Sequence, residues 1–120
     1  MATIVLVDDT LDVHDFVKRA LGKEHTVFTT TQWTDVSTLV FQHDVELILM
    51  DVDMPGFMKG DKVTGILKKS LAQKPVKIVL FSAQDEFELR KKAKEVNADG
   101  YIPKTSNELL LQRRVRKFLK

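Results

Sequence analysis

The sequence predicts an α/β fold in which a doubly wound, five-stranded parallel sheet carries helices on both faces. Short apolar runs alternate with amphipathic segments about five times along the chain, a pattern that implies parallel strands joined by right-handed helical crossovers. The chain has 120 residues, of which 43% are hydrophobic and 30% charged, as in a globular protein with one ordinary core. We therefore expect a single domain over residues 1–120.

Five short segments have the composition of strands. The second is rich in β-branched and aromatic residues, and the fourth is dominated by large apolar side chains, as expected for a strand buried on both faces. The predicted strands cover residues 3–7, 25–30, 46–50, 76–81 and 101–102.

The segments between them have apolar residues at helical spacing. In the first, Val13, Phe16 and Val17 recur at positions i, i+3 and i+4, and the segment ends at Gly22. The breaker segment Met54-Pro55-Gly56 separates the third strand from the third helix. The predicted helices cover residues 11–22, 33–43, a stretch from about 61, 85–96 and 107–120.

The composition narrows the class of protein. There is no cysteine, hence no disulfide and no thiol chemistry. The formal net charge of +2 is too small to argue for a nucleic-acid or membrane partner, and no apolar stretch approaches the roughly 20 residues of a membrane span. The first predicted strand begins at Thr3, and we therefore expect no signal peptide. We expect a cytoplasmic protein without membrane insertion or direct nucleic-acid contact.

Polar residues follow four of the predicted strands. Asp8 and Asp9 follow the first, Asp51 the third, Ser82 the fourth and Lys104 the fifth. In a flavodoxin-like sheet of order 2-1-3-4-5, ligands bind at the carboxyl ends of the strands, where the strand order reverses. We therefore expect these side chains to converge at one rim of the sheet.

A cluster of three carboxylates with a lysine and a serine is expected to bind a metal cation and a phosphoryl group. Two carboxylates about 4 Å apart repel by roughly 4 kcal/mol at an effective dielectric constant near 20. Oxygen ligands suit Mg²⁺, with Mn²⁺ as a second possibility. Lys104 can pair with a phosphoryl oxygen and Ser82 can donate a hydrogen bond to another. The role left for an aspartate is that of the nucleophile in forming an aspartyl phosphate.

Four segments in the same order point to a known family: residues 4–9 (IVLVDD), 49–56 (LMDVDMPG), 79–83 (VLFSA) and 98–104 (ADGYIPK). Over essentially its whole length the chain resembles the receiver domain of two-component response regulators, of which the chemotaxis regulators are examples. The resemblance implies that a histidine kinase or phosphotransfer protein phosphorylates Asp51. It also implies that Asp8, Asp9, Asp51 and the backbone carbonyl of Asp53 hold the metal.

The resemblance implies a switch as well. Ser82 and Lys104 would bind the phosphoryl oxygens, and Tyr101 would turn inward behind Ser82. The face formed by the fourth helix, fifth strand and fifth helix would then change its affinity for a downstream effector or a fused output domain. Ala83 would leave the acyl phosphate accessible. The family implies no enzyme beyond slow autophosphorylation from a small donor and autodephosphorylation.

Two departures from the family pattern leave an alternative open. The loop between Pro55 and Gly60 is one residue longer than is usual, and Lys104 is followed by Thr105 in place of a common proline. A non-proline cis bond costs about 2.5–4 kcal/mol, so we expect this peptide to be trans and Lys104 to approach differently. The alternative is a receiver-fold interaction module that is not phosphorylated.

A second alternative is an enzyme. Asp51-Val52-Asp53 resembles the Asp-x-Asp motif of haloacid-dehalogenase-like phosphatases, with Asp53 as general acid. That family places a paired acidic motif last, whereas here Asp8 and Asp9 come first.

The remaining charged groups have plainer interpretations. We expect the histidines to be surface or capping residues, because their spacing does not suit a metal site. The C-terminal cations fit a solvated helix face. These two sets are His14, His25 and His43, and Arg113, Arg114, Arg116, Lys117 and Lys120.

Overall fold

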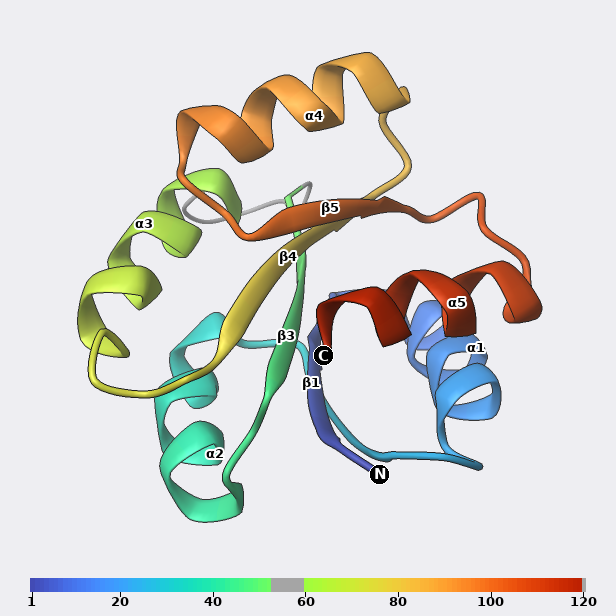
Figure 1. The fold of residues 1–120 in the computed structure, drawn as a ribbon, viewed down its shortest axis with the longest axis horizontal. Coiled ribbons are helices and arrows are strands. Elements are labelled where there is room, and N and C mark those ends of the chain that lie inside the picture. Colours follow the sequence, from blue (N-terminus) through green and yellow to red (C-terminus); the bar gives the residue numbers. More distant parts are fainter. Residues whose placement is uncertain (53–59, 120) are drawn as a thin grey trace.

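The computed structural model describes residues 1–52 and 60–119. Five parallel strands form one sheet in the order β2-β1-β3-β4-β5, which confirms the predicted topology (Figure 1). The strands are β1 (Thr3–Val7), β2 (Thr26–Thr30), β3 (Leu47–Asp51), β4 (Lys77–Ser82) and β5 (Gly100–Pro103).

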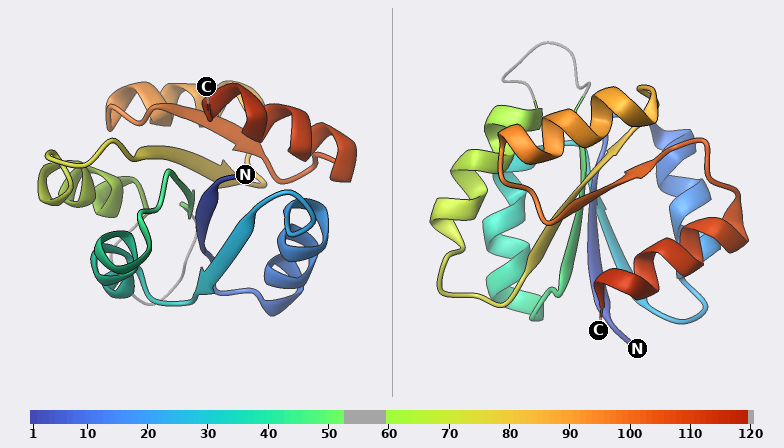
Figure 2. Two further views of the ribbon diagram at one scale, coloured as in Figure 1. Left: turned by 60° about the horizontal axis from the view of Figure 1, so that its bottom comes forward. Right: turned by 45° about the horizontal axis from the view of Figure 1, so that its top comes forward.

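Helices cover both faces of the sheet. Helices α1 and α5 lie on one face, and α2, α3 and α4 lie on the other (Figures 1 and 2). An ion pair between Arg19 and Glu108, at 2.8 Å, joins α1 to α5. The helices are α1 (Leu11–Leu21), α2 (Val36–His43), α3 (Gly60–Ser70), α4 (Glu86–Glu95) and α5 (Glu108–Phe118).

Two apolar clusters fill the space between the layers. Successive residues of a strand point to opposite faces, so Ile48 and Met50 join the cluster under α2, α3 and α4, whereas Leu47 and Leu49 join the one under α1 and α5. All five residues of β3 are buried for this reason. Because both faces of the central strands are buried, polar side chains can reach solvent or a ligand only at the ends of these strands.

The observed boundaries differ slightly from those predicted. Strands β3 and β4 begin and end one residue later, so Asp51 and Ser82 are the last residues of their strands. Residues 33–35 form a 3-10 turn before α2, so the second α-helix is shorter than predicted. Gly22 keeps a right-handed helical conformation and donates to Lys18 O at 2.8 Å. Positive φ angles occur at Asp44 (50°) and Asn97 (58°), which follow α2 and α4.

The predicted loop between Pro55 and Gly60 lies largely outside the described residues, as does Asp53. Helix α3 begins at Gly60, close to the predicted start. Among the described residues, none of the helices combines the length and apolar character that crossing a bilayer requires.

Candidate functional site

Three carboxylates meet at the carboxyl rim of the sheet. Asp8 directly follows β1 and Asp51 ends β3, and the register pairs Val7 with Met50, so the two acids leave neighbouring strands. Oxygen atoms of Asp8, Asp9 and Asp51 all lie within 4.8 Å of one another. Asp8 and Asp51 are buried, at 0% and 2% exposed, whereas Asp9 is exposed. The structure thus brings the predicted acids together.

Lys104 reaches this cluster from the far end of the chain. Strand β5 pairs Pro103 with Ser82, and the Lys104 N–H donates to Ser82 O at 2.8 Å. The Lys104 Nζ lies 2.6 Å from Asp8 Oδ2 and 3.3 Å from Asp51 Oδ1. Burial lowers the pKa of Lys104, but the hydrogen bond and charge of Asp8, together with those of Asp51, outweigh it and raise the pKa above its usual value. Lys104 is therefore a cation at neutral pH.

A serine closes the turn after β5, one residue past Thr105, which stands where the family commonly has a proline. The Lys104–Thr105 peptide is trans, as the sequence predicted. Ser106 is buried, its Oγ donates to Pro103 O at 2.8 Å, and its backbone N–H meets the same oxygen at 3.2 Å. This turn directs Lys104 toward the acids without the proline.

Ser82 ends β4 at the same rim and is fully buried. Its Oγ accepts a hydrogen bond from the Gln84 N–H at 3.1 Å, which orients the segment after the strand. The Ala83 side chain is exposed.

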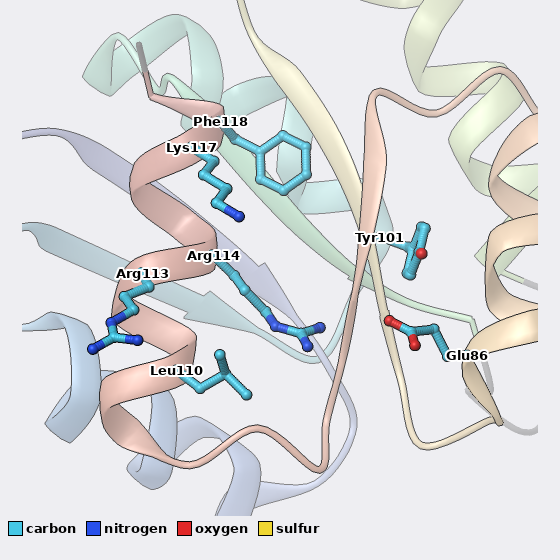
Figure 3. A pocket seen from close by; sticks show the side chains of 7 residues that line it. All are labelled: Glu86, Tyr101, Leu110, Arg113, Arg114, Lys117 and Phe118. Atoms are coloured by element: carbon cyan, nitrogen blue, oxygen red, sulfur yellow. The ribbon is translucent and has the colours of Figure 1, made fainter.

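Tyr101 lies on a different surface of the molecule. Its hydroxyl accepts a hydrogen bond from Arg90 Nε of α4 at 3.3 Å. Figure 3 shows Tyr101 at a hollow of about 370 Å³, with Arg114 extending from α5 toward it. The lining residues are Glu86, Tyr101, Leu110, Arg113, Arg114, Lys117 and Phe118. The inward turn of Tyr101 stays a prediction.

The C-terminal cations divide between two surroundings. Arg113, Arg114 and Lys117 line the hollow on the α4, β5 and α5 side, whereas Arg116 pairs with Glu24 at 2.7 Å. Lys120 lies outside the described residues. The solvated-face interpretation is therefore incomplete for the three that line the hollow.

The acidic cluster has the chemistry of a magnesium site. All its donors are carboxylate oxygens, the ligands that Mg²⁺ prefers. Asp8 Oδ1 accepts from the Thr10 N–H at 2.9 Å, while the buried Oδ2 has the Lys104 ammonium as its partner, at 2.6 Å. A buried carboxylate oxygen in that position fits a cation. The fourth predicted ligand, the carbonyl of Asp53, falls outside the described residues.

Two of the three histidines are more buried than the sequence suggested. His14 is 7% exposed, and its Nε2 lies 2.6 Å from Asp8 O. Its spacing of three and seven residues from Val17 and Leu21 puts it on the buried face of α1, a signal the sequence contained. The His25 side chain is 9% exposed and its Nδ1 accepts from the Ala2 N–H at 3.0 Å. His43 is exposed and stacks on Phe28, as a surface residue.

Comparison with known proteins identifies the family. The family model described as the response regulator receiver domain matches residues 4–116. The chain belongs to this family. A receiver domain is a signalling module of response regulators rather than an enzyme in the ordinary sense, and the phosphatase alternative finds no support.

Curated relatives agree with the family match. The chain is 33% identical over 121 residues to the transcriptional regulatory protein YvrH of Bacillus subtilis (strain 168), covering 99% of this chain and 49% of that protein. It is 27% identical over 118 residues to the aerobic respiration control protein ArcA of Escherichia coli (strain K12), covering 97% and 48%. The chain spans about half the length of the curated relatives it matches.

Solved structures have the same fold. The BeF3-activated N-terminal receiver domain of Klebsiella pneumoniae RstA aligns with a TM-score of 0.83 and 26% identity, over 98% of both chains. The chemotaxis protein CheY4 of Vibrio cholerae aligns with a TM-score of 0.86 over 99% of both chains, and at 22% identity this shows the fold alone.

Proposed function

We propose that this receiver domain is phosphorylated on Asp51 in a magnesium-dependent step of a two-component phosphorelay. The observation that carries the proposal is the convergence at one rim: Lys104 Nζ lies within 3.3 Å of carboxylate oxygens of Asp8 and Asp51, and Asp9 completes a compact oxygen cluster. A surface without function has little reason to bury two carboxylates beside one ammonium, because desolvation of such charges is costly.

The chemistry assigned to Asp51 is nucleophilic substitution at phosphorus. A carboxylate oxygen of Asp51 attacks the donor's phosphoryl group, and the bond from phosphorus to the donor nitrogen or oxygen breaks, with its electron pair leaving on that atom. Lys104 exchanges part of its pairing with the carboxylates for a phosphoryl oxygen, and Ser82 donates its hydroxyl hydrogen to another. Magnesium, held by Asp8, Asp9, Asp51 and the carbonyl of Asp53, would supply positive charge to the same oxygens.

The phosphoryl donor in this proposal is a histidine kinase or phosphotransfer protein. The output is a change at the surface formed by α4, β5 and α5, which Tyr101 joins to the rim through β5. Basic residues line the hollow there, and a downstream effector or an output domain would bind to this surface (Figure 3). A cytoplasmic location belongs to the same proposal.

The alternative of a receiver that is not phosphorylated rested on two sequence departures. One of them, the trans Lys104–Thr105 peptide, is accommodated by the Ser106 turn, and Lys104 still reaches Asp8 and Asp51. That geometry favours a receiver that is phosphorylated over one that is not.

Intact-mass measurement with acetyl phosphate tests the proposal. We expect the wild-type protein to gain one phosphoryl group in the presence of Mg²⁺ and none when the metal is chelated. Asp51→Asn removes the nucleophilic oxygen while preserving side-chain shape, so labelling should disappear.

Asp15→Asn is the matched control, because Asp15 is an exposed acid on α1 that is not part of the cluster of Asp8, Asp9 and Asp51. It should be labelled like the wild type. Persistent labelling of Asp51→Asn would place the acceptor elsewhere, and metal-independent labelling would remove the role given to the acidic cluster.

A further inference from the structure

Strand β1 ends beside the acidic cluster, where its backbone leaves the sheet. The registers of β1 with β2 and with β3 both stop at Val7. The Asp8 N–H still donates to Thr30 O at 3.1 Å, but the Asp8 carbonyl lies beyond both registers. Asp8 is fully buried. A buried carbonyl requires a hydrogen-bond donor from another part of the fold.

His14 supplies that donor from α1. Its Nε2 lies 2.6 Å from Asp8 O, and the residue is 7% exposed. A carbonyl oxygen can only accept, so Nε2 must carry the hydrogen and donate it. The His14 backbone N–H donates in turn to Thr10 O at 3.2 Å, which ties the histidine to the first turn of its helix.

The contact between His14 and the Asp8 carbonyl affects both Asp8 and Asp9, because one peptide group joins these two residues. The Asp8 carbonyl and the Asp9 N–H belong to the same planar peptide group, so the imidazole sets the orientation of the plane that joins the two residues. The Asp8 side chain has its own support from the Thr10 N–H, at 2.9 Å. The exposed Asp9 carboxylate accepts a longer and weaker hydrogen bond, from Thr10 Oγ1 at 3.4 Å. The place of Asp9 therefore depends mainly on the backbone that His14 orients.

We propose that His14 is a positioning residue for the magnesium site, acting through the Asp8–Asp9 peptide. It touches neither the metal nor the phosphoryl group in this role. The inference rests on the proposed function, because it concerns the same metal site. Groups that orient metal ligands typically contribute about 10- to 100-fold in metal affinity.

Calorimetric titration of Mg²⁺ into wild-type protein and two variants tests this role. His14→Leu keeps an apolar side chain in the buried site but removes the donor, whereas His14→Gln places an amide N–H where Nε2 donates. We expect His14→Leu to raise the Kd for Mg²⁺ by at least about tenfold and His14→Gln to stay within about threefold. At saturating Mg²⁺, the phosphorylation rate of His14→Leu should return to within about threefold of the wild type, since the loss lies in metal binding.

Val17→Ala is the matched control for loss of packing. Val17 is fully buried on the same face of α1 and belongs to the apolar cluster under α1 and α5. Its truncation should lower stability and leave the Kd for Mg²⁺ unchanged. An equal rise in Kd for Val17→Ala, or a wild-type Kd for His14→Leu, would overturn the positioning role.

A measurement on the wild-type protein keeps the test independent of how well a variant folds. Long-range ¹H–¹⁵N spectra should show the His14 ring protonated at Nε2, with signals that move when Mg²⁺ is added. Protonation at Nδ1 alone, or His14 signals that stay fixed while the Asp9 amide responds to Mg²⁺, would refute the proposal. A wild-type protein that binds no Mg²⁺ would overturn the proposed function itself, which separates the two failures.

Discussion

At the scale of single residues, the site is a balance of buried charge. Asp8 and Asp51 are almost completely buried, and each lies close to the Lys104 ammonium. The raised pKa of Lys104 means that its stabilising contribution is complete below about 10.5, its usual value, and is lost only as the pH rises through the folded-state value. Over the neutral range Lys104 therefore stays charged. A change in the free energy of unfolding between about pH 5 and 8 must come from other groups of the protein.

His25 is one such group. Burial lowers its pKa below the usual 6.5, against the opposing charge of Glu24, and its Nδ1 accepts the Ala2 N–H only when that nitrogen is unprotonated. Because the unfolded chain binds the proton more readily, the stability due to neutral His25 is present above pH 6.5 and is lost as the pH falls toward the lower folded-state pKa.

We predict that His25→Asn, which places an acceptor oxygen near the position of Nδ1, reduces the loss of stability as the pH falls. Urea unfolding of both proteins at pH 7.5 and 5.5 measures it, and the wild type should lose more of its free energy of unfolding between the two. Equal losses would show that another group titrates. His43→Asn serves as the control, because His43 is exposed.

At the scale of elements, β5 links the reactive rim to the α4 and α5 surface. One end of the strand leads to Lys104, its middle carries Tyr101, and Gly100 begins it. The ring of Phe118, at the end of α5, covers Gly100 so closely that a Cβ atom added there would overlap the ring. The absence of a side chain at Gly100 therefore sets how closely α5 packs on β5.

We predict that Gly100→Ala destabilises the fold by about 1–3 kcal/mol through overpacking. Adding Phe118→Ala should remove part of that cost, so the double variant should be more stable than the sum of the single changes implies. Urea unfolding of all four proteins gives the coupling. Strict additivity would mean that the Phe118 ring moves aside freely. Gly65→Ala is a control, because nothing lies within 4 Å of the Cβ position at that helical glycine.

At the scale of the whole molecule, chain topology gathers distant residues. Parallel strands end at the same rim, so residues from Asp8 to Lys104 share one site although they are far apart in sequence. A ligand bound there stabilises the entire domain by mass action, because the unfolded chain does not hold the cluster together. Metal binding is thus measurable as global stability.

We predict that Mg²⁺ at about 100 times its Kd raises the free energy of unfolding by about 2.7 kcal/mol. In Asp9→Ala this gain should largely disappear, while stability without metal stays within about 0.5 kcal/mol of the wild type, because Asp9 is exposed and the ion pairs of Lys104 involve the other two acids. Thermal unfolding with and without Mg²⁺ measures both. Collapse of the metal-free protein would make Asp9 structural, and an undiminished Mg²⁺ gain would exclude it as a ligand.

Most of the fold was readable from local pattern. The buried strands β3 and β4 are strongly apolar because helices cover both sheet faces, and that signal survives an error of one residue at each end. The convergence of Asp8, Asp51 and Lys104 followed from strand order alone. The short 3-10 turn before α2 was not separable from the helix, since its residues continue the same spacing.

The amino-acid sequence by itself indicated the family through four motifs in order. It also predicted a parallel sheet with polar residues at one rim, because alternation and strand-end position are local properties of the chain. Only the tertiary structure decided that His14 holds the Asp8 carbonyl and that Ser106 closes the turn behind Lys104. It also decided that the Tyr101 hydroxyl of β5 accepts a hydrogen bond from Arg90 of α4. Such contacts depend on which backbone groups the packed sheet leaves without partners, and this becomes defined only when helices and strands are in place.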